Sequence, residues 1–192
     1  MIAVRLLRDR RGASAAEFAL VLPLLLFFLF GIIDGGRLMW MSNRAEKAAQ
    51  MGARYVAVTD MIPSTLASRD FALNGGVPGG DPVPTNLFST TVCNNSSCTN
   101  SWGYNGPAFT KVVERIRLFF PEATATNVLV QYDNVGLGFA GDPNGPDVSP
   151  VITVKLVGVE FRPLVLLAFK TVTLPDYASS ITAEDLSGNV SN

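Results

Sequence analysis

Few residues of this sequence could do chemistry, and Glu17 is the most unusual of them. The chain of 192 residues contains no histidine, which removes the commonest general base and the commonest metal ligand. Glu17 stands directly before residues 18–33, a run without a single charged residue. A carboxylate within a transmembrane segment costs on the order of a few kcal/mol and usually marks a functional site. Glu17 is therefore the first candidate for a functional residue.

The other polar residues do not form a recognisable enzyme site. The sequence has no Gly-x-Ser-x-Gly motif, no phosphate-binding glycine loop with a lysine, and no dense pair of carboxylates. Asp142, Asn144 and Asp147 have part of the spacing of a calcium loop, but two prolines interrupt it and no bidentate Glu follows. We interpret 141–147 as a turn, and we expect no enzyme activity, no cofactor and no small-molecule substrate.

The apolar run is long enough to cross a membrane. Extended back to Ala13, it comprises the 21 residues 13–33. A helix of that length covers about 32 Å at ~1.5 Å per residue, enough to cross a hydrocarbon core of ~30 Å. We therefore predict a transmembrane helix over 13–33, preceded by a basic leader over 1–12.

The charges on either side of this run predict its orientation. Four arginines precede it, whereas the far side opens with Asp34 and a single Arg37. The positive-inside tendency then keeps the N-terminus in the cytoplasm and places the rest of the chain outside the inner (cytoplasmic) membrane. An ordinary secretory signal is the alternative, but the run exceeds the usual ~7–15 residues and no small-x-small cleavage site follows it. A processing junction is expected before the run.

The two cysteines, Cys93 and Cys98, are separated by four residues. Because the expected location outside the cytoplasm is oxidising, we predict a disulfide between them. Such a short loop contributes ~2 kcal/mol of stability and mainly fixes a local turn. Two thiols in a chain without histidine cannot complete a tetrahedral metal site. The net charge of −1 and the dispersed basic residues also argue against nucleic-acid binding.

The segment before the apolar run resembles the cleavage site of class III signal peptides, those of type IV pilins and pseudopilins. The pattern is Gly12, four further residues, then Glu17 and the aromatic Phe18. The resemblance implies cleavage between Gly12 and Ala13 by a prepilin peptidase, which leaves Glu17 as the fifth residue of the mature chain. Phe18 departs from the tyrosine that is usual in the small Flp pilins of tight-adherence pili.

Residues 11–57 look like the TadE-like family of tight-adherence (Tad) pilus assembly proteins, and the C-terminal part is similar in outline. The matching features are Glu17, Pro23, the Gly-Gly-Arg that ends at Arg37, and the small-residue stretch 48–55. TadG-like and TadF-like relatives share the N-terminal pattern. Membership implies a pilin-like protein whose partners are the prepilin peptidase and other pilins or pseudopilins of the Tad apparatus.

The resemblance also assigns a role to each residue of the junction. Gly12 lacks a side chain, so a peptidase at the membrane surface can bring its carboxylates close to the scissile bond. Glu17 pairs with the new α-amino group of a neighbouring subunit and so sets axial register during assembly. The alternative for Glu17 is that it lies one turn inside the membrane interface and snorkels to the headgroups.

Beyond the apolar run we expect the helix to continue over 34–58, because apolar residues recur there at close to helical spacing. Its small residues allow close approach either of another subunit or of the protein's own core. These residues are Ala45, Ala48, Ala49 and Gly52.

Residues 59–192 are expected to form a small extracytoplasmic α+β domain with an antiparallel sheet. We predict helices over 64–73, capped by Ser64, and over 109–119, with a long loop at 74–107. We predict strands at 127–132, 148–161 and 178–183, with the turn 141–147 between the first two. The apolar residues 164–169 are too few to span a bilayer and are either buried or in contact with the membrane.

The sequence thus favours a minor pilin or pseudopilin of a tight-adherence pilus, processed after Gly12 and held in the membrane by its N-terminal helix. The alternative is an unprocessed, membrane-anchored protein whose outer domain binds a partner or acts as a scaffold. An envelope enzyme ranks third.

Overall fold

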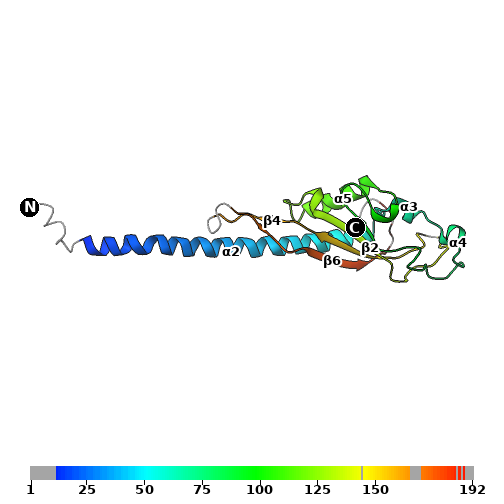
Figure 1. Ribbon diagram of the computed structural model, residues 1–192, viewed down its shortest axis with the longest axis horizontal. Coiled ribbons are helices and arrows are strands. Elements are labelled where there is room, and N and C mark those ends of the chain that lie inside the picture. Colours follow the sequence, from blue (N-terminus) through cyan, green and yellow to red (C-terminus); the bar gives the residue numbers. More distant parts are fainter. Residues whose placement is uncertain (1–11, 144, 165–169, 185, 187, 189–192) are drawn as a thin grey trace, which may run out of the picture. The chain divides into compact units, whose positions relative to one another are not determined.

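The computed structural model describes residues 12–143, 145–164, 170–184, 186 and 188 (Figure 1). The chain divides into two compact units. One comprises residues 1–41 and 160–172, and we call it the stem unit. The other comprises residues 42–159 and 173–192, and we call it the head.

A single helix, α2 (Ala13–Ala57), begins the described chain, and it runs without a break through Pro23 (Figure 1). Its apolar first part is open to the surroundings, with Leu20 79% and Leu24 71% exposed. By length and composition this helix could cross a membrane. The sequence prediction of a long apolar helix followed by an α+β head with an antiparallel sheet is confirmed.

The head contains a four-stranded antiparallel sheet in the order β1-β2-β3-β6. Its strands are β1 (Thr91–Cys93), β2 (Val128–Asp133), β3 (Val151–Leu156) and β6 (Tyr177–Thr182). Val130 pairs with Val154 across β2 and β3, and Val154 pairs with Ser179 of β6. Two shorter strands, β4 (Glu160–Phe161) and β5 (Val172–Thr173), form a separate ladder.

One face of the sheet is the hydrophobic core of the head. Val130 and Val154 are fully buried there, as are their neighbours two residues along each strand, in keeping with the period of a strand. On the opposite face, the hydroxyls of Thr153 and Ser180 are hydrogen-bonded at 2.8 Å, and the Lys155 ammonium donates to the side-chain oxygen of Gln131 at 2.9 Å. The sheet is thus apolar toward the helices and polar on its other side.

The C-terminal part of α2 packs on the apolar face together with α5 (Gly106–Arg117). A Cβ added to Gly52 would lie 2.9 Å from Ile116 of α5 and 3.3 Å from Val154 of β3, so only glycine fits without a shift. The other small residues of the same stripe are 0% exposed, namely Ala45, Ala48 and Ala49. Of the two alternatives for this stripe, contact with the protein's own core is confirmed.

Several predicted boundaries were wrong. The helix expected over 64–73 is two short helices, α3 (Ser64–Ala67) and α4 (Phe71–Asn74). Ser64 is the first helical residue rather than the cap, and Asp70 breaks the segment because its side chain accepts from Leu73 N–H at 2.8 Å.

The segment 74–107, expected to be a loop throughout, contains the edge strand β1 and a 3₁₀ turn, η2 (Thr99–Ser101). α5 begins before the expected Phe109, because the side chain of Asn105 caps Ala108 N–H at 3.1 Å. The strand expected over 148–161 is interrupted at Gly158, which has a φ of +61°. Residues 165–169 of the apolar segment lie outside the described residues.

A buried tyrosine connects the sheet to the chain that follows α2. Tyr132 of β2 is 0% exposed, and its hydroxyl accepts the N–H of Ile62 at 3.2 Å. Burial raises the pKa of Tyr132, and the hydrogen bond from Ile62 opposes this only in part. The neutral phenol is therefore the form that the fold requires.

We expect Tyr132→Phe to lower the free energy of unfolding by about 1–3 kcal/mol at neutral pH, because the Ile62 N–H loses its buried acceptor. The raised pKa adds a pH dependence. Tyr132 supports folding fully below its unfolded pKa of ~10, and this support declines as the pH rises above that value. The difference between wild type and variant should therefore narrow above pH ~10.

The measurement is denaturant unfolding of the full chain in detergent at pH values from 7 to beyond ~10. Tyr177→Phe is the matched control, since the buried Tyr177 hydroxyl has no hydrogen-bond partner among the described residues. It should leave stability unchanged or raise it. Equal effects of the two variants would contradict the role given to Tyr132.

Candidate functional site

The junction predicted for processing lies where the first helix begins. Gly12 is exposed, α2 starts at Ala13, and a Cβ added at Gly12 would meet no atom within 4 Å. The first N–H groups of a helix have no intrahelical partner. The peptide bond between Gly12 and Ala13 therefore lies at the exposed start of the helix, where breaking it disturbs at most the first turn of α2. The leader residues 1–11 lie outside the described residues.

Glu17 and Phe18 lie about one turn inside α2, and both are exposed, Phe18 to 64%. Glu17 follows Ala13 by four residues, so the two positions lie on the same face of the helix. No hydrogen bond or ion pair joins Glu17 to another described residue. The single chain thus presents this carboxylate outward, close to the helix start.

A second carboxylate, at the other end of the apolar run, was missed as a site residue. Asp34 is 3% exposed and accepts the N–H of Leu164 with both oxygens, at 2.9 and 3.1 Å. Arg37, one turn further on, donates to Asp34 at 3.2 Å and to the carbonyl of Arg162 at 3.4 Å. The sequence shows only the acid and the arginine three residues apart. It does not show the contact with Leu164, which lies 130 residues further along the chain.

The predicted disulfide is confirmed, since Cys93 and Cys98 are bonded. Between them Asn94 forms a compact turn, in which its side-chain oxygen accepts from Ser96 and Ser97 N–H, each at 2.9 Å. Thr99 continues the motif by accepting the N–H of Val92 of β1 at 2.9 Å. This disulfide loop therefore covers the outer edge of β1.

The turn at 141–147 serves the fold. Asp147 is 4% exposed, and its carboxylate accepts Phe71 N–H at 2.6 Å and Asp142 N–H at 3.1 Å. These bonds tie the turn to the start of α4. The carboxylate is already occupied by backbone donors, so the interpretation of this segment as a turn is supported.

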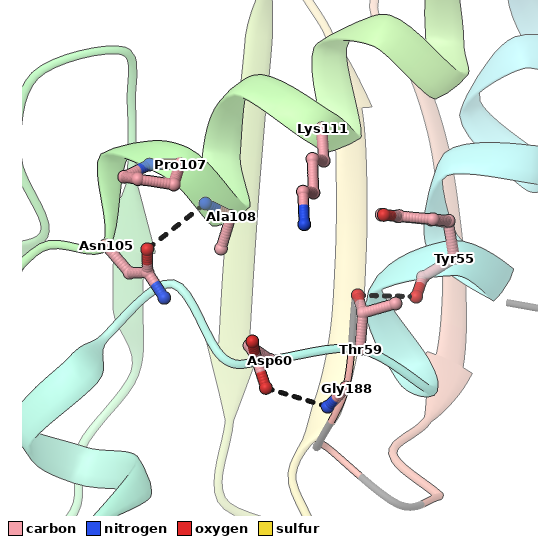
Figure 2. Close-up of a pocket in the computed structure, with 8 residues that line it drawn as sticks. All are labelled: Tyr55, Thr59, Asp60, Asn105, Pro107, Ala108, Lys111 and Gly188. Carbon is pink, nitrogen blue, oxygen red and sulfur yellow. Dashed lines mark hydrogen bonds between the residues drawn. The ribbon is translucent and has the colours of Figure 1, made fainter. Parts of the chain in front are cut away.

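A small cavity lies in the head between α2 and α5 (Figure 2). Its volume is about 40 Å³. Tyr55 and Lys111 point toward one another across it (Figure 2). The Asp60 carboxylate accepts Gly188 N–H at 2.7 Å, so this side chain joins the segment after α2 to the C-terminal segment. Ligand pockets usually measure ~300–1,000 Å³, so this cavity suits ordered water and no substrate.

Comparison with known proteins bears on the N-terminal part of the chain. Residues 12–54 match the family model described as TadE-like protein. The N-terminal segment of this chain is similar to that family. The match confirms the resemblance stated from the sequence. No curated protein and no solved structure matches the chain.

The TadE-like match begins at Gly12, at the predicted junction, and covers α2 except its last three residues. It includes Glu17, Phe18 and Asp34, and it ends before the strands of the head. The match thus covers the exposed apolar part of α2 and the small residues that are buried in the head.

The disulfide loop gives a stability prediction for this protein. Replacing both Cys93 and Cys98 with alanine should lower the free energy of unfolding of the full chain by about 2 kcal/mol, because it restores loop entropy to the unfolded chain. Denaturant unfolding in detergent measures this. Wild type treated with reductant should shift equally, and an unshifted midpoint in both samples would contradict the prediction.

Proposed function

We propose that this TadE-like protein is a minor pilin or pseudopilin that takes part in assembly of a tight-adherence pilus. In this proposal a prepilin peptidase removes residues 1–12, and the helix holds the chain in the inner membrane, with the head outside the cytoplasm. The observation that carries the proposal is a family match that starts at Gly12 and covers an exposed apolar helix with Glu17 near its start.

The accessibility of the junction supports the processing step. A Cβ at Gly12 would meet no atom within 4 Å, and the bond to be cut lies at the very start of α2. A peptidase at the membrane surface could bind this bond in an extended form by opening only the first turn of the helix. Glycine also allows the enzyme's carboxylates to approach the carbonyl closely.

Glu17 then has a physical reason to bind a neighbour. Cleavage creates an α-ammonium group at Ala13, where the helix dipole already places partial positive charge. Glu17 lies four residues further on, about 6 Å along the axis at ~1.5 Å per residue. A neighbouring helix displaced by that distance brings its Glu17 level with the new ammonium group. The pair neutralises both charges in a low-dielectric environment and so selects one axial register.

The proposed role is mechanical and associative rather than enzymatic. The functional groups of the proposal lie on α2, and the helix also supplies the stripe on which the head is built. Subunit contacts in this proposal are made along the first part of α2. ATP hydrolysis for assembly is supplied by another protein in this scheme.

The processing step predicts a mature chain that starts at Ala13. The measurement is the intact mass and N-terminal sequence of native protein from cells with and without their prepilin peptidase. Gly12→Val should block cleavage without disturbing the fold, since the added atoms meet open space. The matched control is Gly36→Val, which also enters open space. A chain that starts at Met1 in both strains would refute processing.

Glu17→Gln should abolish or strongly reduce piliation while leaving the start at Ala13 unchanged, because the neutral amide cannot pair with an ammonium charge. Pili on the cell surface are counted by electron microscopy. Glu46→Gln is the matched control, since Glu46 is an exposed carboxylate of the same helix within the head. Normal piliation in Glu17→Gln would remove the assembly role and leave snorkelling as the explanation of Glu17.

The alternative of an anchored binding module has one observation in its favour. The loop after β2 exposes Val135, Leu137 and Phe139 to between 42% and 51%. It is held firmly, since Asn134 donates to Val83 O at 2.8 Å and accepts from Gly136 N–H at 2.9 Å. A peptidase-independent N-terminus would favour this alternative.

A further inference from the structure

The stem unit brings a distant segment of the chain against α2 at the end of the apolar run. Residues 18–33 carry no charge, and Asp34 is the first ionisable residue after them. A carboxylate here would meet the boundary between hydrocarbon and headgroups if residues 13–33 span the bilayer, because 21 residues cover about 32 Å. The chain from 160 onward covers this carboxylate.

Two contacts fix the direction in which the covering segment runs. Arg37 donates to the carbonyl of Arg162, and its guanidinium lies 5.4 Å from the centre of the Phe161 ring. Two residues further along, Leu164 N–H donates to Asp34. From 162 to 164 the segment therefore moves from the level of Arg37 to that of Asp34, toward the apolar run.

The contact with Asp34 fixes Leu164 at the level where the apolar run ends. The Leu164 side chain is 63% exposed despite the bonding of its backbone. The chain returns at Lys170 and pairs through β5 with β4.

The exposed residues around Leu164 have the composition of a membrane interface. Arg162 precedes Leu164 in the sequence and Lys170 follows it, and both are exposed. Trp40, about two turns beyond Asp34 on α2, is 62% exposed. Basic side chains that bind lipid headgroups and tryptophans at headgroup level are typical of residues at a bilayer surface.

We propose that Arg162, Leu164 and Lys170 form a second membrane contact, held at the bilayer surface by Asp34 and Arg37. Leu164 inserts beside the end of the spanning helix, and the two basic residues bind lipid headgroups. The occupant is the lipid bilayer because Leu164 is bonded to Asp34, the residue that directly follows the exposed apolar surface of α2. The inference rests on the membrane anchorage in the proposed function, and it adds a second attachment point to the single helix.

A depth measurement tests this contact. The full chain, with its disulfide intact, is labelled with a nitroxide at one introduced cysteine and reconstituted in vesicles of phosphatidylethanolamine and phosphatidylglycerol. Leu164→Cys reports the proposed contact, and its exposed side chain can be replaced without loss of packing. Phe27→Cys reports the spanning helix, and Leu118→Cys, at a 70% exposed position of the head, is the matched control in water.

The expected result is a ratio of oxygen to nickel-complex accessibility roughly ten-fold higher for the Leu164 label than for the Leu118 label, since a polar reagent is excluded from hydrocarbon. The Phe27 label should also lie in lipid. Asp34→Ala should lower the ratio at Leu164 toward that at Leu118 and leave Phe27 unchanged. An unchanged ratio at Leu164 would overturn the holding role of Asp34.

The outcomes separate this inference from the membrane anchorage on which it rests. A lipid signal at Phe27 with a water signal at Leu164 overturns the second contact and leaves the anchor intact. A water signal at Phe27 refutes the anchor and the inference together. Dipolar broadening between Leu164 labels shows that a second copy covers the patch, and it also overturns the bilayer as occupant.

Discussion

Close packing of small residues on α2 against the sheet is the interaction on which the head depends. At Gly52 the helix backbone approaches Ile116 and Val154 so closely that a Cβ would meet a side-chain atom at 2.9 Å. Ala48 and Ala49 extend the same contact and are fully buried, whereas Leu20 of the apolar part is 79% exposed. One helix thus has two parts with opposite requirements. Its first part needs an apolar environment around it, and its second part supplies that environment to the sheet.

Local patterns predicted the parts of the fold that local forces determine. The apolar run, the helical spacing after it and the short spacing of Cys93 and Cys98 each contain their own physical reason, and all three predictions are confirmed. β1 was missed because three residues are too few for a periodic pattern, and it exists only by pairing with β2. The break in the predicted helix 64–73 was missed for a related reason. Asp70 is an ordinary helix residue in sequence, and its preference for capping decides the local structure.

The buried polar contacts lay beyond sequence reasoning because each joins residues that are far apart in the chain. Tyr132 receives Ile62 N–H across 70 positions, and Asp147 receives Phe71 N–H across 76. Both bonds satisfy backbone donors that have no helix or strand partner, Ile62 in the chain between α2 and α3 and Phe71 at the start of α4. Nothing in the amino-acid sequence distinguishes the tyrosine or the aspartate that makes such a bond from others that do not. These two contacts explain how the irregular segments around α3 and α4 keep a defined path over the core of the head.

The two carboxylates at the ends of the apolar run, Glu17 and Asp34, differ in which partners balance their charge. This difference bears on function. Asp34 is buried under Leu164 N–H and Arg37, so its charge is balanced inside the chain. Glu17, about 26 Å away along the axis at ~1.5 Å per residue, is exposed and joined to none of the described residues. An exposed carboxylate beside hydrocarbon is stable only with water, headgroups or a cation supplied from outside. In the sequence, Glu17 stands out because a carboxylate beside an apolar run is energetically unfavourable. The structure adds Asp34, whose charge is balanced by partners within the same chain. The proposed assembly role gives Glu17 an equivalent partner in a neighbouring subunit.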